Sequence, residues 1–469
     1  MSLSRRGFLA GSSAAVAFAA FRNAFAANVP IAGSLVDPQS VAPATRGPLA
    51  LPPGFEQVVL SVTGAAMDDG LVVPGKHDGM GAFDGGGGKV LLVRNHEINP
   101  AMGVAIGAFG PKLERLGSID AGRLYDAGAK GVPCLGGTTT LLYDPSRRRI
   151  ERQHLSLCGT AVNCAGGRTP WGSWVSCEEC VYLPDGKVFA KEHGYCFEVH
   201  ADAEGGLVEP VPLKALGRFT HEAVAFDPKR PVMYLTEDLG DSAFYRFLPR
   251  TPGKLADGGR LQALVAIDRP GFDSRNWPPI DAKGLPTGPP VVTARMGDRF
   301  PCRWIDLDEV EAPRNDLRTR AYAKGAMRLA RCEGIWHGGD AVYITATTGG
   351  TGALGQVWRY VPSPDEGTDA EAAHPASIEL FLESHDAAQL KNCDNLCAAP
   401  WGELFVCEDG TGRDGIVRIK PTGEVHRFAL NVTNDSELAG VCFSPDGTTL
   451  FVNIQDPGMT VAITGPWER

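Results

Sequence analysis

Short apolar runs dominate the pattern of hydrophobic positions along this chain, and long amphipathic repeats are rare. Runs such as Val90-Leu91-Leu92-Val93 and Leu404-Phe405-Val406 contain β-branched or aromatic residues, follow shortly after glycine or proline, and are followed within a few residues by an acid. Such runs predict buried β-strands, because their length, composition and flanking turn residues all favour strand over helix. The 58 glycines and 35 prolines add many tight turns, so the sequence predicts an all-β protein.

One hairpin pattern recurs along the chain. A polar residue of metal-ligand type opens a short strand, a turn with glycine or proline follows, and a second apolar strand usually ends on an acid or an amide. The six copies occupy residues 78–97, 163–179, 221–238, 333–345, 394–409 and 437–455. Repeated hairpins of this kind are typical of the inner strands of a β-propeller, where each blade packs against its neighbours. We therefore predict a six-bladed β-propeller.

The segments between the hairpins predict the outer strands and surface insertions of this propeller. A minor helix is expected at residues 315–329, outside the ring, and the apolar tail 461–467 is expected to add a strand that closes it. The long insertions lie around residues 98–135, 180–215, 246–330 and 359–390.

A β-sandwich is the alternative fold, since hairpins with Asp-Gly or proline-containing turns occur there too. The recurring acid in front of the first strand favours the propeller. A sandwich has no reason to place a carboxylate at the same point of every hairpin, whereas a propeller brings these strand ends to one central channel. We expect a single propeller domain over residues 27–469.

The N-terminal segment has the features of an export signal. Arg5-Arg6 is followed by Phe8-Leu9, an alanine-rich apolar run and the small-residue site Ala24-Phe25-Ala26. This order predicts a twin-arginine signal peptide over residues 1–26, read by the twin-arginine translocation machinery, and a periplasmic or secreted mature protein. No later apolar run is long enough to cross a bilayer, so we expect no stable membrane insertion after cleavage.

The charge balance narrows the choice of partners. The net charge is -10, and no arginine- or lysine-rich stretch is present, which argues against a nucleic-acid partner. An acidic surface can simply serve solubility. Alternatively, the carboxylates are gathered to bind hard cations.

The hairpin termini favour the second interpretation. Carboxylates brought to one channel mouth repel one another unless cations are present, and clustered oxygen ligands suit Ca²⁺. For any single acid, a solvated loop carboxylate is the better interpretation, so the prediction depends on their recurrence. The opening residues are Asp78, Cys164, Glu222, Glu333, Asp394 and Glu437, and the closing acids are Glu97, Glu178, Glu179, Glu237 and Glu408.

Two residues depart from this pattern of carboxylates. Cys164 is the thiol among the opening residues, and a thiolate beside carboxylates indicates a softer, redox-capable metal such as iron, although a packed core cysteine is the alternative. Arg331 precedes Glu333 by two positions. Strand alternation would point both side chains the same way, so Arg331 could bind a phosphate or form a salt bridge with the acids.

Ten segments, taken together, resemble the PhoX alkaline phosphatase family, and they follow one another over nearly the whole mature chain. They are Asn95-His96-Glu97, Asn163-Cys164-Ala165-Gly166-Gly167, Thr169-Pro170-Trp171-Gly172, Cys177-Glu178-Glu179, Arg218-Phe219-Thr220-His221-Glu222-Ala223, Thr236-Glu237-Asp238, Arg331-x-Glu333-Gly334, Asp394-Asn395, Cys407-Glu408-Asp409 and Ile463-Thr464-Gly465-Pro466-Trp467.

The resemblance implies a secreted phosphomonoesterase with a centre of Fe³⁺ and Ca²⁺. The residue matching Cys164 binds a pair of oxo-bridged irons in that family, and the residue matching Arg331 holds the phosphate. The carboxylates implied to complete the centre are Glu222, Glu333, Asp394 and Glu437. Those implied to bind calcium are Glu97, Glu178, Glu179 and Glu408.

The predicted reaction is release of phosphate from a small-molecule phosphate ester by attack of a metal-bound oxygen, with Cys164 and Arg331 as the catalytic residues. Two alternatives remain at this point: a phosphodiesterase on the same centre, and a non-catalytic binding propeller stabilised by calcium. A pure calcium scaffold requires neither Cys164 nor Arg331, which argues against the last. We expect the protein to be a monomer.

Overall fold

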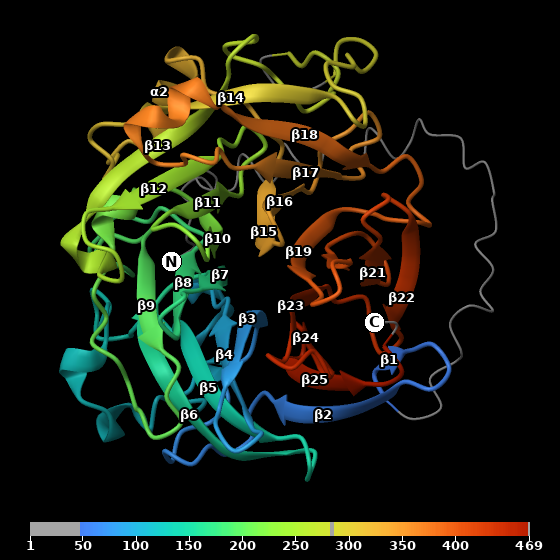
Figure 1. Cartoon of the computed structure of the whole chain (residues 1–469). Coiled ribbons are helices and arrows are strands. Elements are labelled where there is room, and N and C mark those ends of the chain that lie inside the picture. Colours follow the sequence, from blue (N-terminus) through green and yellow to red (C-terminus); the bar gives the residue numbers. More distant parts are fainter. Residues whose placement is uncertain (1–46, 282–285, 468–469) are drawn as a thin grey trace.

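The computed structural model describes residues 47–281 and 286–467. Figure 1 shows antiparallel sheets arranged around a central axis, with few helices. The prediction of an all-β, propeller-like protein is therefore confirmed. The predicted signal peptide lies outside the described residues, and within them no helix is long and apolar enough to span a membrane.

Two sheets form the first part of the arrangement, each an antiparallel meander that starts at the centre. The first has the order β3-β4-β5-β6 and the second the order β7-β8-β9. Their strands are β3 (His77–Asp84), β4 (Val90–His96), β5 (Gly136–Asp144), β6 (Arg149–Thr160), β7 (Asn163–Arg168), β8 (Ser173–Glu178) and β9 (Cys196–His200).

A nine-stranded sheet follows, in the order β10-β11-β12-β13-β14-β18-β17-β16-β15. The strand β14 pairs with β13 on one side and β18 on the other, so it joins two four-stranded units at their outer edges. The strands are β10 (His221–Phe226), β11 (Met233–Glu237), β12 (Tyr245–Pro249), β13 (Gly259–Ala266), β14 (Arg299–Asp306), β15 (Cys332–Gly338), β16 (Ala341–Ala346), β17 (Gln356–Val361) and β18 (Ala376–Glu383).

The last two sheets combine both ends of the described chain. The N-terminal strands β1 and β2 add outer strands to them, pairing with β22 and β25, so the ring is closed from the N-terminal side as well as by the apolar tail. The strands are β1 (Leu49–Ala50), β19 (Cys393–Ala398), β20 (Leu404–Glu408), β21 (Gly415–Ile419) and β22 (Val425–Asn431), then β2 (Glu56–Val62), β23 (Leu438–Phe443), β24 (Thr449–Ile454) and β25 (Met459–Thr464).

The innermost strands contact one another in a closed cycle, β3 with β7, β7 with β10, β10 with β15, β15 with β19, β19 with β23, and β23 with β3. Apolar side chains fill the spaces between neighbouring sheets; Phe405, Val441 and Ile463, for example, belong to one buried cluster. The strands therefore read as nearly continuous apolar runs, since both faces of each sheet are covered.

Within residues 47–281 and 286–467, the helices are short and lie in the insertions. The helix α2 (Leu317–Ala323) ends well before the predicted residue 329, because Gly325 adopts a φ of +93° and Leu329 pairs as an isolated bridge with Ser242. The 3₁₀ helices are η2 (Pro100–Met102), η3 (Val104–Ile106), η4 (Leu116–Ser118), η5 (Ala121–Arg123), η6 (Lys214–Leu216), η7 (Leu255–Asp257) and η8 (Asp369–Ala373).

Candidate metal centre

Five inner hairpins share one irregularity at their open end. In each of them, the first residue of the inner strand pairs with the last residue of the next strand. The pairing register shifts directly after this pair, and such a shift marks a β-bulge. The residues that follow these pairs stand at the open ends of the hairpins, and all of them except Thr347 are carboxylates or Cys164. The pairs are His77 with His96, Asn163 with Glu178, His221 with Glu237, Cys332 with Ala346, and Cys393 with Glu408.

Nine of the side chains that follow these pairs, together with Glu437 directly before β23, form an acidic cluster at the channel mouth, because electrostatic contacts link each one to others of the set. Its deeper members are Asp78, Glu222, Glu333 and Asp394, and its more accessible members are Glu97, Cys164, Glu179, Asp238, Asp409 and Glu437.

The acidic cluster contains two sets of possible ligands whose donor atoms lie within 4.8 Å of one another. One set is Cys164, Glu179 and Glu222, and the other is Asp78, Glu97 and Glu437. The thiol of Cys164 links them, since its Sγ lies 3.2 Å from Glu222 Oε1 and 3.6 Å from Asp78 Oδ1. A thiol among carboxylates can serve a softer metal, while the all-oxygen set suits a hard cation.

Burial and mutual repulsion make the acidic cluster hold protons when it has no cation. Burial raises the pKa of Asp78 to about 6 and that of Glu97 to about 8. Burial and then the neighbouring carboxylates raise the pKa of Glu179, Glu222 and Asp394 well above the ordinary range. Bound cations would remove this penalty by stabilising the ionised forms.

Glu333 gives a direct test of whether the residues present fit a metal. Both of its carboxylate oxygens are buried and accept no hydrogen bond from the described residues; its charge contact is the guanidinium of Arg331. Oε1 has this one ion pair and Oε2 has no hydrogen-bond partner among the described residues, and a buried carboxylate with so few donors is costly. The acidic cluster therefore has the unsatisfied oxygen ligands that a metal centre requires.

Arg331 reaches the acidic cluster from the residue before β15, where its φ of +49° places it in the left-handed region. Its Nε and Nη2 donate to the two carboxylate oxygens of Asp238 at 2.8 and 3.0 Å. The same guanidinium contacts Glu333 and lies 3.6 Å from Asp409. The backbone turn, rather than strand alternation, puts Arg331 and Glu333 on the same side.

Lys76 occupies the corresponding place before β3 and has the same φ of +49°. Its Nζ donates to Gln455 Oε1 at 2.9 Å and pairs with Asp456. The Nε2 of Gln455 donates in turn to Asp78 Oδ2 at 2.9 Å and to Glu97 Oε2 at 2.7 Å. Sequence reasoning missed Lys76, although its position relative to the opening residue Asp78 matches that of Arg331 relative to Glu333.

Glu178 and Glu408 were predicted to bind calcium, and the structure does not bring them into the acidic cluster. Glu178 accepts hydrogen bonds from the amides of Ala161, Gly194 and Tyr195 and contacts His193. Glu178 and Glu408 each belong to the last ladder pair of their own hairpin. Their side chains therefore point away from the channel.

The other closing acids follow the same rule. Glu408 accepts from the Gly415 amide at 3.1 Å and pairs with Arg427, and Glu237 accepts from the Tyr245 hydroxyl at 2.8 Å. The next residues, Asp409 and Asp238, take the places in the acidic cluster. Sequence reasoning missed both acids, although each stands beside a predicted one.

Close contacts between inner strands narrow the channel below the acidic cluster. A Cβ on Gly79 would lie 2.5 Å from the Cα of Ala165, and one on Gly334 would lie 2.4 Å from the carbonyl oxygen of Asp394. Larger residues at these positions would push neighbouring inner strands apart. The packing favours access to the acidic cluster from the channel mouth.

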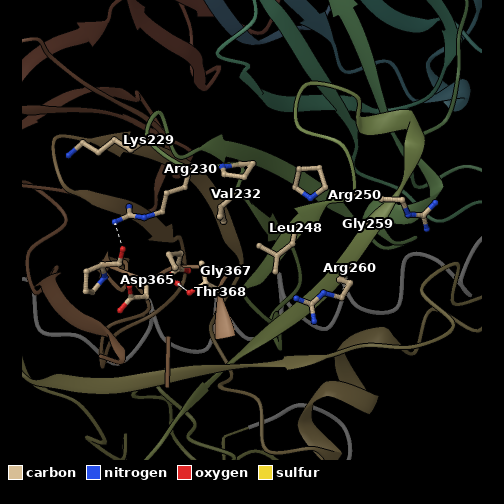
Figure 2. Close-up of a pocket in the computed structure, with 14 residues that line it drawn as sticks. Lys229, Arg230, Val232, Leu248, Arg250, Gly259, Arg260, Asp365, Gly367 and Thr368 are labelled. Carbon is tan, nitrogen blue, oxygen red and sulfur yellow. Dashed lines mark hydrogen bonds between the residues drawn. The ribbon is translucent and has the colours of Figure 1, made fainter. Parts of the chain in front are cut away.

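A separate cavity of about 610 Å³ lies by the β10–β11 turn, at the opposite end of these strands from Glu222 (Figure 2). Arg230, Arg250 and Arg260 line it, but Figure 2 shows their guanidinium groups pointing in different directions. Arg230 already pairs with Asp227 at 2.8 Å. The cavity contains no member of the acidic cluster and does not resemble a convergent anion site.

The family model described as alkaline phosphatase PhoX matches residues 36–458 of this chain. The chain belongs to the PhoX alkaline phosphatase family. It is accordingly a phosphatase, a phosphoric monoester hydrolase, and its family implies metal dependence, for which the acidic cluster supplies candidate ligands. Members of this family are generally exported. None of the curated proteins matches this chain.

The fold agrees with a solved structure, that of Pseudomonas fluorescens PhoX in complex with vanadate, a transition-state analogue. The two chains share 20% identity, with a TM-score of 0.64 over 91% of this chain and 97% of the other. A gluconolactonase from Xanthomonas campestris is a more distant match, with 12% identity, a TM-score of 0.37 and coverage of 88% and 99%.

Proposed function

We propose that this protein is an exported phosphomonoesterase whose acidic cluster holds iron and calcium ions. The observation that carries the proposal is the position of Cys164, whose thiol lies between the two sets of carboxylates. In this proposal Cys164, Glu179 and Glu222 hold Fe³⁺, and Asp78, Glu97 and Glu437 hold Ca²⁺. Glu333 and Asp394 complete the centre from the deeper side.

When bound, the metal ions withdraw charge from the phosphoryl group and stabilise the transition state. The protein contributes the guanidinium of Arg331, which we assign to the phosphate oxygens. Asp238 holds this guanidinium through two hydrogen bonds, so the planar group is oriented before substrate binds. Lys76 fixes the amide of Gln455, which then holds one oxygen each of Asp78 and Glu97.

We further propose four properties of the whole chain. The cycle of innermost strands is counted as six blades, with the nine-stranded sheet taken as two blades joined by β14. Residues 27–469 make one domain, and the protein is a monomer. The twin-arginine signal of residues 1–26 directs export of the protein after it has folded. The metals can therefore be inserted in the cytoplasm, where Cys164 is kept reduced.

Metal analysis combined with a phosphatase assay tests this proposal. Protein purified after its natural export should contain iron and calcium and should hydrolyse p-nitrophenyl phosphate. Cys164→Ala should lose iron and activity together while calcium largely remains. Full metal content and full activity in Cys164→Ala would show that Cys164 is a packed core cysteine. Faster turnover of the corresponding bis-ester would instead identify a phosphodiesterase.

A further inference from the structure

A pair of buried thiols lies outside the acidic cluster, in the sheet β7-β8-β9. Cys177 is on β8 and Cys196 is on β9, and both are fully buried. They are directly opposite each other in the ladder, and their Sγ atoms are 3.6 Å apart. This arrangement concerns neither metal binding nor the phosphatase reaction.

The register of the two strands suits a covalent bond. The Glu178 amide donates to the Tyr195 carbonyl oxygen at 3.1 Å, so the neighbouring pair Cys177–Cys196 is a non-hydrogen-bonded pair. In such pairs the Cα atoms are about 4.5 Å apart and the side chains approach closely. This spacing falls within the range that disulfides require, about 4.4 to 6.8 Å.

The backbone around Cys196 supports the same geometry. Its carbonyl oxygen accepts a hydrogen bond from the Leu213 amide at 2.9 Å, on the side away from β8. The two side chains can therefore approach without breaking a backbone hydrogen bond between β8 and β9. To form a bond, rotation about the two Cα–Cβ bonds would have to bring the sulfur atoms from 3.6 Å to about 2.05 Å.

We propose that Cys177 and Cys196 form a cross-strand disulfide in the exported protein. The bond would tie the end of β8 to β9 and close the loop between them. That loop begins with Glu178 and Glu179 and also contains His193, so the bond would restrain one wall of the acidic cluster.

The oxidation uses a disulfide as the oxidant, either that of a thiol oxidase or a small-molecule disulfide. One thiolate attacks the oxidant and releases one thiol, and the second thiolate then resolves the mixed disulfide and releases the other thiol. The protein loses two electrons and two protons, and the oxidant becomes two thiols. Because β9 is the outer strand of its sheet, local opening of this strand can expose both sulfur atoms.

Peptide mapping of the exported protein tests the proposal without any substitution. The protein is denatured without reductant, alkylated with N-ethylmaleimide, digested and examined by mass spectrometry. We expect a linked peptide pair that contains Cys177 and Cys196 and that separates after reduction. Recovery of both cysteines as separate alkylated peptides, also after equilibration with oxidised glutathione, would overturn the proposal.

A melting experiment gives a second, independent measurement. Reduction should lower the melting temperature of the wild-type protein by several degrees, because the unfolded chain regains freedom. Cys196→Val, which keeps a small apolar side chain, should not respond to reductant. The control is Cys302→Ser, at a buried cysteine on β14 whose thiol donates to the Phe300 carbonyl oxygen; it should respond as the wild type does. Equal responses from the wild type and Cys196→Val would refute the bond, whatever the phosphatase activity.

Discussion

Two neighbouring groups of buried carboxylates balance their charge in different ways. The first, which we call the His193 network, consists of Asp126, Glu178 and His193. The imidazole lies 2.7 Å from Glu178 Oε1 and 3.1 Å from Asp126 Oδ2, and backbone amides donate to both acids. The second group is the acidic cluster, where carboxylates outnumber the two nearby cations: Arg331, which contacts Glu333, and Lys76, which binds Gln455.

The pKa values show the difference. Burial alone would lower the pKa of His193, but its two carboxylate partners raise it to about 12. Burial likewise would raise the pKa of Asp126, yet the hydrogen bonds from His193 and the backbone lower it to about 2. In the acidic cluster, burial raises the pKa of Glu97 to about 8. The His193 network is neutralised by the protein itself, whereas the acidic cluster needs cations from outside.

Metal removal should have the largest effect, and it should affect only one of the two groups. We expect stripped protein to lose about 10³-fold or more in phosphatase activity, since the metals supply several kcal/mol of transition-state stabilisation. The melting temperature should fall as well, because ions that bind only the folded state stabilise it and their removal loses that contribution. Full activity in protein shown by elemental analysis to be free of metal would contradict the assignment of the centre.

Arg331→Ala should have the second-largest effect, a loss of about 10²-fold in kcat/KM. Its metal content should be unchanged. Arg331→Lys should recover little, because an ammonium group cannot replace the planar fork held by Asp238. Arg418→Ala is the matched control, since Arg418 pairs with Glu403 at 2.9 Å outside the acidic cluster. A metal-free Arg331→Ala would mean that Arg331 supports the metal centre rather than the substrate.

The adjacent residues Glu178 and Glu179 allow the sharpest comparison of stability with metal binding. Glu178→Gln leaves His193 with one carboxylate and should cost about 3 kcal/mol in the free energy of unfolding, while the metal content stays near wild type. Glu179→Gln should lose metal and activity with little effect on the stability of the metal-free protein. Denaturant unfolding and elemental analysis of both variants check this prediction. Loss of metal in Glu178→Gln together with loss of stability in Glu179→Gln would mean that Glu178 binds metal and Glu179 stabilises the fold.

The metal-free protein should lose stability as the pH rises from about 4 to about 8. Asp78 and Glu97 have pKa values raised from 3.8 and 4.5 to about 6 and about 8 in the folded state. The stability that they contribute is complete below their unfolded pKa values and disappears as the pH passes through the folded ones. The metal-loaded protein should show no such decline.

His193 provides an internal reference for that experiment. Its pKa is raised from 6.5 to about 12, so its contribution is complete below pH 6.5 and decreases only above it, in both forms of the protein. Melting temperatures of stripped and loaded protein, measured across pH 4.5 to 8.5, separate the two groups. Parallel curves below pH 6.5 would show that the acidic cluster does not titrate as described.

Lys76→Met should have the smallest effect, a loss of less than about 10-fold in activity, because Lys76 reaches the acidic cluster through Gln455. Calcium affinity should weaken as the amide of Gln455 loses its fixed orientation. Lys76→Arg should restore part of it. Steady-state kinetics at several calcium concentrations check this prediction, and a loss as large as that of Arg331→Ala would make Lys76 a direct substrate ligand.

The sequence alone determined much of the fold and the general nature of the site. Recurring apolar runs with turn residues predicted the all-β, propeller-like arrangement, because strand burial depends on local composition. The recurrence of acids at hairpin ends led to a metal centre, and the opening residues Asp78, Cys164 and Glu222 do meet at the channel mouth. Both features recur in every hairpin, so a wrong assignment at one position did not change the predicted fold or the predicted kind of site.

Only the tertiary structure decided which of two adjacent acids faces the channel. Glu178 and Glu179 are chemically alike in sequence, and the same holds for the neighbours Glu408 and Asp409. Their directions depend on where the last ladder pair ends and where the bulge lies, which is a property of two paired strands. The left-handed turns that direct Lys76 and Arg331 inward, and the donors that satisfy Glu178, likewise come from residues distant in sequence. The direction of a side chain at the end of a strand depends on the register with the partner strand, so it cannot be predicted from the sequence of one strand alone.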